Sequence, residues 1–180
     1  MLARVVAVSL NSNHTFSKTN VKTIKLSEGL GIEGDAHFGR TVQHLYLKKK
    51  CPERHNRRQV HLMASERIKE WQAKGHAVWP GSLGENITTE GLDLERLPKG
   101  TRIRFEGGAQ ILLTGLRKPC RQIENFSTGL LDETISKDSE NEPRFLAGIM
   151  AIVESDGYVS VGDKAEKCLP GKPFQPVDTV

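Results

Sequence analysis

Short apolar segments separated by turn residues constrain the fold of this chain more than any other feature of its sequence. Some alternate apolar and polar residues, and others are short apolar runs, as expected of half-buried and fully buried strands. Glycine, aspartate and asparagine, which favour turns, lie between them. The segments cover residues 2–10, 22–26, 59–63, 86–89, 102–105, 109–116, 148–153 and 158–161. This pattern predicts a mainly β, α+β protein: a mostly antiparallel β-barrel, closed or partly closed, with a few peripheral helices.

The clearest turn signal is the pair Asp156-Gly157, which separates the last two segments. An Asp-Gly pair between two apolar runs is a strong hairpin signal, so residues 148–153 and 158–161 are expected to pair with each other.

Helices are expected at three places. The first covers residues 65–74, with Ser65 as its capping residue. The second begins at Pro119, because proline suits the first position of a helix, where its missing N–H is no loss. The third runs from Gly129 to about Lys137.

The length of 180 residues, with 37% hydrophobic and 27% charged residues, fits one globular domain. We expect that domain to cover residues 1–168 and the proline-rich segment 169–180 to be an extended or mobile tail. No apolar stretch approaches the roughly 20 residues that span a bilayer, so no membrane association is expected. The 26 basic and 22 acidic residues leave a mild excess of positive charge, +4.

The three cysteines, Cys51, Cys120 and Cys168, are an odd number and contain no CxxC pair. This is neither a disulfide framework nor a closed zinc site, and it fits a reducing, cytoplasmic compartment.

Cys120 has the sequence context of a reactive thiol. It lies between an expected strand and an expected helix start, among Arg117, Lys118 and Arg121. Unpaired backbone N–H groups, the positive end of a helix and neighbouring cations all favour the thiolate, which is the form that attacks electrophiles and binds metals. The alternative is a buried structural cysteine, and the local sequence leaves both open.

Two turns could line a ligand site. The glycine-dense run 29–39 contains Asp35 and His37, and the turn Gly84-Glu85-Asn86 precedes a strand. Glycine permits close backbone approach to a ligand, and successive N–H groups can bind an anion. Tight structural turns would explain both segments equally well.

A basic segment from Lys48 to Arg58 follows the glycine-dense run. It can be a solvated surface loop or a cationic rim that attracts a phosphate-bearing ligand. Nucleic acid is a weaker alternative, because no binding module accompanies the segment. Hydrolase, zinc-protease and phosphate-loop motifs are absent from the sequence.

Five motifs in order resemble the MOSC domain family, named after the C-terminal domain of molybdenum cofactor sulfurases, in its small stand-alone bacterial type. The resemblance covers about residues 2–165. The motifs that carry it are Gly31-Ile-Glu-Gly-Asp35-Ala-His37, Arg58-Gln-Val-His-Leu62, Leu83-Gly-Glu-Asn86 through Gly91, Arg117-Lys-Pro-Cys120, and Ala147-Gly-Ile149 through Gly162-Asp163.

The resemblance implies a MOSC-type β-barrel and a role for Cys120 in molybdenum or sulfur chemistry. As the catalytic residue, Cys120 would be the molybdenum ligand. The molybdenum cofactor, molybdopterin, is the implied cofactor. Pyridoxal phosphate is not expected, because no lysine stands in a suitable frame for a Schiff base. The candidate cofactor-binding residues are Asp35, His37, Arg58, Glu85, Asn86, Arg117, Lys118 and Arg121.

Three hypotheses follow. The chain is a molybdenum enzyme that reduces N-hydroxylated small molecules with electrons from a donor protein. Alternatively, it carries sulfur as a persulfide on Cys120, received from a cysteine desulfurase, for metal–sulfur cluster or cofactor assembly. The third is a non-enzymatic anion or nucleic-acid binder. Under the first two, the Gly31–His37 loop and the Gly84–Asn86 turn should converge with Cys120 around one cleft, because a thiolate alone cannot orient a bulky anionic cofactor.

Overall fold

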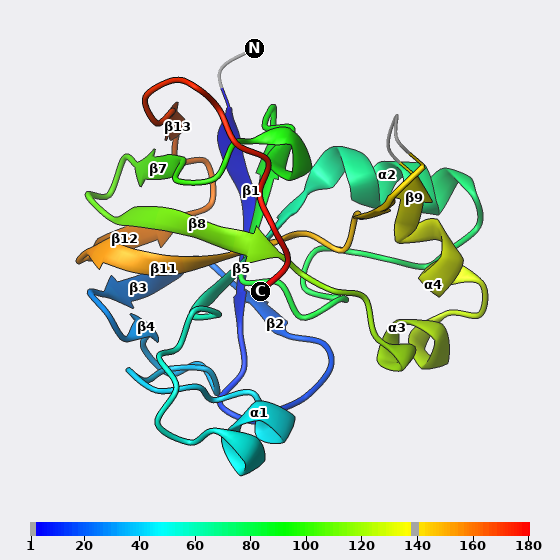
Figure 1. Cartoon of the computed structure of the whole chain (residues 1–180), viewed down its shortest axis with the longest axis horizontal. Coiled ribbons are helices and arrows are strands. Elements are labelled where there is room, and N and C mark those ends of the chain that lie inside the picture. Colours follow the sequence, from blue (N-terminus) through cyan, green and yellow to red (C-terminus); the bar gives the residue numbers. More distant parts are fainter. Residues whose placement is uncertain (1–2, 138–140) are drawn as a thin grey trace.

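The computed structural model describes residues 3–137 and 141–180, and its main element is an eight-stranded sheet (Figure 1). The strand order is β13-β7-β8-β11-β5-β6-β1-β2. Every ladder in this sheet is antiparallel except that between β5 and β6. The strands are β1 (Arg4–Leu10), β2 (Thr19–Val21), β5 (Val60–Ala64), β6 (Ile87–Glu90), β7 (Arg102–Phe105), β8 (Gln110–Leu116), β11 (Ile149–Ser155) and β13 (Ala165–Cys168).

Two smaller sheets complete the β structure. One has the order β12-β3-β4, with β12 (Gly157–Ser160), β3 (Thr23–Ser27) and β4 (Gly31–Ile32), and the other pairs β9 (Ile135–Lys137) with β10 (Pro143–Phe145). The mainly β, mostly antiparallel prediction is therefore confirmed. A closed barrel is not observed: the eight-stranded sheet has two outer strands, β13 and β2, with no ladder between them in the described residues. Backbone hydrogen bonds between Val5 of β1 and residues 162 and 163, which follow β12, join the eight-stranded sheet to the smaller sheet. They do not close the strands into a barrel.

The hairpin predicted at Asp156-Gly157 is wrong. β11 pairs with β5 and β8, whereas β12 crosses to the smaller sheet and pairs with β3. The Asp156 carboxylate accepts a hydrogen bond from the Glu28 backbone N–H at 2.6 Å, which holds this crossing against β3 rather than against β11. The chain there also packs against residues 107–109, where the Tyr158 N–H donates to the Gly107 carbonyl.

The helices are short and partly differ from expectation. They are α1 (Leu45–Lys50), α2 (Ser65–Ala73), α3 (Arg121–Phe126) and α4 (Leu130–Glu133), with a single 3-10 turn at Leu94–Arg96. Helix α2 was predicted and buries Ile68 and Trp71, but Ser65 is its first helical residue and not its cap. The helix expected at Pro119 begins at Arg121, and the third expected helix ends at Glu133 and continues as β9. Helix α1, in the basic segment, was not predicted.

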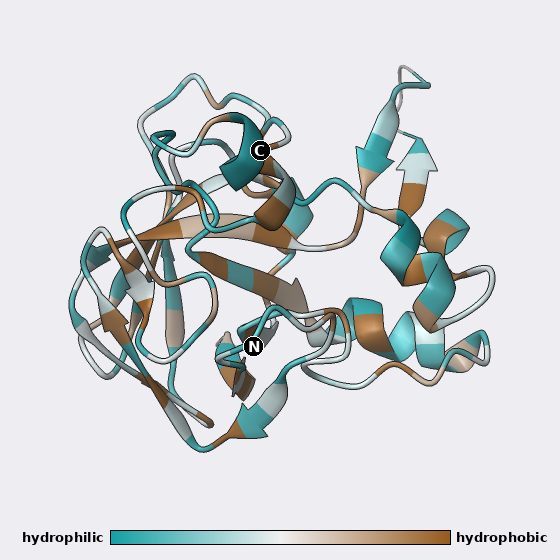
Figure 2. Ribbon diagram, turned by 90° about the horizontal axis from the view of Figure 1, so that it is seen from below, coloured by the Kyte–Doolittle hydropathy of each residue, from teal (hydrophilic) through white to brown (hydrophobic). Residues whose placement is uncertain are grey.

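Two clusters of buried apolar residues lie on either side of strand β5. The larger fills the space between the sheets, and the smaller, with Met63, Trp71, Ile123 and Leu130, lies under α2, α3 and α4. Figure 2 shows hydrophobic residues recurring along the strands and on the helices, with hydrophilic ones between them. All five residues of β5 are buried, as expected for a strand covered on both faces. No helix in residues 3–137 and 141–180 combines the length and the apolar character needed to cross a membrane.

The tail beyond β13 has no regular structure of its own, but its last residues pack against the sheet. The Leu116 N–H donates to the Asp178 carbonyl at 2.7 Å, and Thr179 forms an isolated bridge with Leu116. Val177 is buried. This segment therefore lies beside the end of β8, immediately before Arg117.

Candidate functional site

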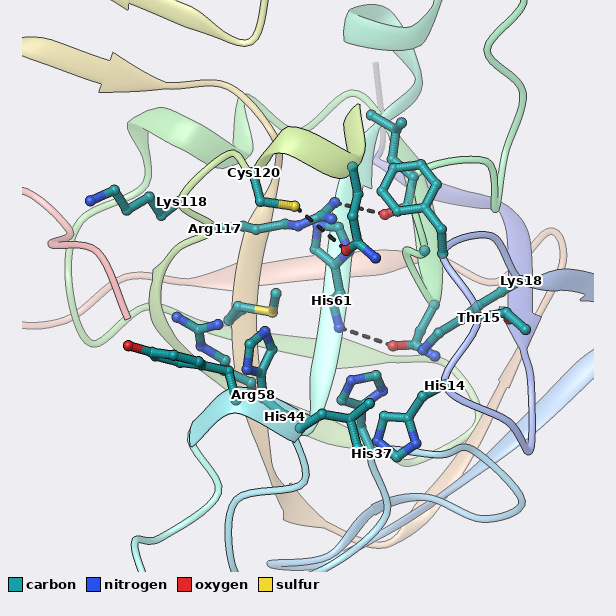
Figure 3. Close-up of a pocket in the computed structure, with 18 residues that line it drawn as sticks. His14, Thr15, Lys18, His37, His44, Arg58, His61, Arg117, Lys118 and Cys120 are labelled. Atoms are coloured by element: carbon teal, nitrogen blue, oxygen red, sulfur yellow. Dashed lines mark hydrogen bonds between the residues drawn. The ribbon is translucent and has the colours of Figure 1, made fainter. Parts of the chain in front are cut away.

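An open pocket of about 340 Å³ lies where the end of β8 faces the loop between β1 and β2 (Figure 3). Cys120, Arg117 and Lys118 lie on one side of it, and His14, His37 and Lys18 lie on the other. The predicted convergence of the Gly31–His37 loop, the Gly84–Asn86 turn and Cys120 is confirmed, since all three contribute to the lining. The lining residues are His14, Thr15, Phe16, Lys18, His37, His44, Leu45, Tyr46, Arg58, His61, Leu83, Gly84, Asn86, Arg117, Lys118, Cys120, Gln122 and Met150.

Cys120 is exposed at this pocket, so it is not a buried structural cysteine. It is the residue that precedes helix α3, with an extended backbone. Its thiol lies 3.6 Å from Oε1 of Gln122, to which it donates. Helix α3 has only six residues, so the dipole at its start is weak. The electrostatic support comes instead from Arg117.

Arg117 follows β8, and its side chain lies beside Cys120 at the pocket (Figure 3). It also donates to the Leu83 carbonyl at 2.6 Å and lies over the Phe16 ring, 6.0 Å from its centroid. Burial lowers the pKa of Arg117, and its attraction to Cys120 and Glu85 opposes that shift. Among the described residues it forms no ion pair with a carboxylate. A thiolate or a bound anion would therefore be a favourable partner for it.

Asp35 does not line the pocket but lies fully buried behind its wall. Its Oδ2 forms an ion pair with Lys18 at 2.7 Å and accepts a hydrogen bond from the Asn86 amide at 3.0 Å. Its Oδ1 accepts from the His37 backbone N–H at 3.0 Å and lies 3.2 Å from the His37 ring Nδ1. Burial alone would raise the pKa of Asp35, but the His37 hydrogen bond and the Lys18 charge outweigh it, so the pKa lies well below its usual range. Asp35 thus holds three pocket-lining side chains in place.

Glu85 also lies outside the pocket. It is completely buried, and its carboxylate accepts hydrogen bonds from the backbone N–H groups of Gly81 at 2.7 Å and Leu83 at 3.1 Å. Burial raises the pKa of Glu85. It shapes the turn that presents Gly84 and Asn86, and so it would support a ligand site from behind the pocket wall.

The cationic candidates separate into two groups. Arg58, Arg117 and Lys118 line the pocket, whereas Arg121 lies on α3 outside the lining. Arg58 donates a hydrogen bond to the backbone carbonyl of Val180. Burial, together with the charges of Arg54 and Arg117, lowers the pKa of Arg58. The basic segment contributes only Arg58 to the lining among its described residues, and Leu45 and Tyr46 come from the part of α1 that precedes it.

Sequence analysis missed Lys18 and every lining histidine except His37. His14 and His44 belong to no sequence motif, yet both line the pocket. The ring Nδ1 of His44 is buried and has no partner in the described part of the chain. Burial lowers the pKa of His44, and nearby Arg58 adds to the effect. No sequence signal for Lys18 exists, because its partner Asp35 is brought to it only by the fold.

His61 of β5 faces the pocket from its floor and is almost completely buried. Its Nε2 lies 2.9 Å from the Ala147 carbonyl and must donate to it, which defines the tautomer. Burial, with the charge of Arg117, holds the pKa of His61 well below its ordinary value, so the ring is neutral. No group of three or more His, Cys, Asp or Glu side chains in the described residues is arranged to hold a metal ion.

Comparison with known proteins places this chain in a family. The MOSC domain model matches residues 33–166. The chain belongs to the MOSC domain family. It is 29% identical over 182 residues to the Bacillus subtilis (strain 168) protein named "Putative metal-sulfur cluster biosynthesis proteins YuaD", covering 92% of this chain and 90% of that protein.

Solved structures agree on the fold. The crystal structure of YuaD from Bacillus subtilis matches with a TM-score of 0.73 and 27% identity, over 95% of this chain and 98% of that one. YiiM from Escherichia coli matches with a TM-score of 0.62 and 19% identity, over 96% of this chain and 73% of that one. YiiM from Geobacillus stearothermophilus matches with a TM-score of 0.65 and 15% identity, over 97% and 79%. The two YiiM matches support the fold alone.

Proposed function

We propose that the chain binds the molybdenum cofactor in this pocket, with the Cys120 thiolate as a ligand of the metal, and reduces N-hydroxylated small molecules. One observation carries the proposal. An exposed thiol lies at a pocket lined by Lys18, Arg58, Arg117 and Lys118, while no carboxylate of a described residue lines it. Such a site favours an anionic ligand that carries a soft, thiolate-binding metal.

The residues present fit the cofactor. Molybdopterin carries a phosphate, and arginine forks and lysine ammonium groups are the usual partners of phosphate oxygens. Arg117 forms no ion pair with a carboxylate of the described residues, so an anion would be a favourable partner for it. The Nδ1 of His44, which has no partner among the described residues, could hydrogen-bond the polar pterin ring, whereas the Asn86 amide is already bonded to Ser9, Asp35 and His61. When bound, the cofactor supplies the redox chemistry of the metal, and Cys120 would hold it at the mouth of the pocket.

Metal analysis with an activity assay tests this proposal. Protein produced in cells that make the cofactor should contain about one molybdenum per chain and should reduce benzamidoxime to benzamidine with a chemical electron donor. Cys120→Ser should lose both properties while keeping the fold. Cys51→Ser, a change at another exposed cysteine, should keep both. Wild-type protein without molybdenum would contradict the proposal.

A second candidate is a sulfur carrier for metal–sulfur cluster or cofactor assembly, with a persulfide on Cys120. Two observations favour it: the Cys120 thiol is accessible to a second protein, and the name of YuaD refers to metal–sulfur cluster biosynthesis. The partner would then be a cysteine desulfurase, which transfers one sulfur atom to the thiolate. Incubation with a desulfurase and cysteine should add one sulfur to Cys120 by mass spectrometry, but none to Cys51 or Cys168. Molybdenum-free protein that acquires this sulfur would favour the carrier over the enzyme.

A further inference from the structure

Lys18 is an unusual lysine because it lines the pocket while its side chain is only 5% exposed. It lies at the end of the loop between β1 and β2, and its backbone N–H donates to the Gly81 carbonyl at 2.8 Å, which fixes its position. Figure 3 shows it on the opposite side of the pocket from Cys120. A ligand between these two residues would meet a thiol on one side and an ammonium group on the other.

Asp35 keeps this ammonium group in place. Its carboxylate lies 2.7 Å from Nζ of Lys18 and also accepts hydrogen bonds from Asn86 and from the backbone N–H of His37. With its oxygens so occupied and its pKa lowered, Asp35 is a fixed counter-ion and not a proton acceptor. It anchors Lys18 in its protonated form at the pocket wall.

Lys18 nevertheless has the electrostatic setting of an acid. Burial lowers its pKa below that of an ordinary lysine; the attraction of Asp35 and Glu85 opposes the shift, and Arg117 adds to it. Lys18 therefore faces the carboxylates of Asp35 and Glu85 behind the pocket wall and the guanidinium of Arg117 across the pocket. The other titratable or charged side chains of the lining are His14, His37, His44, Tyr46, Arg58, His61, Lys118 and Cys120.

We propose that Lys18 is the proton donor of the reaction in this pocket, an inference that rests on the proposed reduction of N-hydroxylated compounds. Reduction of R–NH–OH to R–NH₂ and water takes up two electrons and two protons and breaks the N–O bond. The electrons come from the external electron-donor protein. Lys18 gives one proton to the departing oxygen, which leaves as water, and solvent supplies the second proton to nitrogen and then recharges Lys18. A buried ammonium beside a fixed carboxylate suits this step, because neutralising the oxygen as it leaves requires a positioned acid.

Substitutions that separate charge from acidity test the proposal. Lys18→Arg keeps the positive charge and the Asp35 partner, but a guanidinium is too weak an acid to give up a proton. The variant should keep the wild-type molybdenum content and lose about 100-fold or more in turnover at neutral pH, the usual contribution of a general acid. The matched control, Lys25→Arg, changes an exposed lysine that pairs with Glu33 on β3 and should retain wild-type turnover. Turnover of Lys18→Arg within threefold of wild type, or loss of its molybdenum, would overturn the proposal in favour of a purely structural or binding role.

Labelling of the cofactor-free protein provides a readout that does not depend on activity. Competitive acetylation followed by mass spectrometry reports the pH at which each lysine becomes reactive. Lys18 should become reactive at a lower pH than the exposed lysines, and Asp35→Asn should lower that pH further by removing its counter-ion. Labelling of Lys18 at the same pH as the exposed lysines would overturn the proposal even in active protein. Wild-type protein that lacks both molybdenum and activity would contradict the proposed function itself. Active wild-type protein with a Lys18→Arg variant of similar turnover would contradict only the role of Lys18.

Discussion

At the scale of single residues, Asp35 links the stability of the protein to the charge of its pocket. Asp35→Asn would leave the Lys18 ammonium buried without a carboxylate, and one-sided removal of a buried ion pair costs roughly 3–5 kcal/mol in the free energy of unfolding. Urea unfolding at neutral pH measures this loss. Asp93→Asn, which removes one carboxylate of an exposed pair with Arg96, should change the same free energy by less than about 1 kcal/mol. Equal losses in the free energy of unfolding for the two variants would contradict a stabilising role for the buried Asp35–Lys18 ion pair.

The same carboxylate predicts acid sensitivity. Because the pKa of Asp35 is lower in the folded than in the unfolded chain, its stabilisation is complete above the unfolded value, near about pH 4, and is lost as pH falls towards the folded value. The wild-type free energy of unfolding should therefore drop below about pH 4, and the drop should be smaller in Asp35→Asn. Unfolding curves collected between neutral and acidic pH decide this, and parallel pH profiles for both proteins would exclude Asp35 as the cause.

His61 acts at higher pH. Its folded pKa is well below its unfolded value, so below about pH 6.5 the unfolded chain binds a proton that the native ring does not. Stability should fall as pH decreases below that point, by at most about 1.4 kcal/mol per pH unit for one proton. His61→Gln should remove this part of the slope, whereas His76→Gln, at a histidine that contacts Ser127 away from the pocket, should leave it unchanged. An unaltered slope in His61→Gln would assign the acid sensitivity to another group.

At the scale of elements, the alternation of apolar and polar residues identified the strands that bury one face. It missed strands that exist only because they pair with a neighbouring strand. The expected strands at 22–26 and 102–105 exist because Ile24, Leu26, Ile103 and Phe105 point inward in alternation. β4, with two residues, is a strand only through its pairing with β3. The Asp-Gly hairpin failed for the opposite reason: a strong local turn signal was overridden by tertiary pairing with β3. Pairing partners far apart in sequence carry no local signal.

Gly157 shows why that crossing is possible. A Cβ at this position would lie 2.2 Å from the Ala109 backbone nitrogen, so only glycine allows the two segments to approach. Gly157→Ala should therefore lower the free energy of unfolding by roughly 1–3 kcal/mol, as overpacking does. Gly171→Ala, where an added Cβ meets nothing within 4 Å, is the matched control and should be close to neutral. Thermal or urea unfolding compares them, and similar stability for both would mean that the backbone at 157 can move away.

At the scale of the whole molecule, the fold gathers positive charge that the sequence scatters. Lys18, Arg58 and Lys118 come from distant segments, and only their convergence makes a cationic pocket around Cys120. Motif order was sufficient to identify Cys120, Arg117 and Asn86 as site residues, because each follows directly from a strand or turn in the sequence. Lys18, His14 and His44 could not be identified in the same way, since their place depends on which loops meet. The charge of Lys18 adds to a field that acts on any anion approaching the thiol.

This field makes a prediction about Cys120. Iodoacetate is an anion and iodoacetamide is neutral, so the ratio of their alkylation rates at one thiol reports the local potential. The ratio should be higher at Cys120 than at Cys168, and it should fall as salt is raised from about 10 mM to about 500 mM, because the screening length shortens from roughly 30 Å to a few ångströms.

Cys120 should also be the fastest of the three cysteines with iodoacetamide, since the Arg117 guanidinium lies beside it and attracts it electrostatically. Arg117→Met should lower both the ratio and the rate at Cys120, whereas Lys164→Met, which removes a cation outside the pocket lining, should change neither. Peptide mapping by mass spectrometry follows each cysteine separately in one reaction. A rate ratio that is equal at all three cysteines and insensitive to salt would mean that solvent screens the pocket charges before they reach the sulfur. The cationic lining would then not attract an anionic ligand at a distance, and recognition would depend on direct contacts alone.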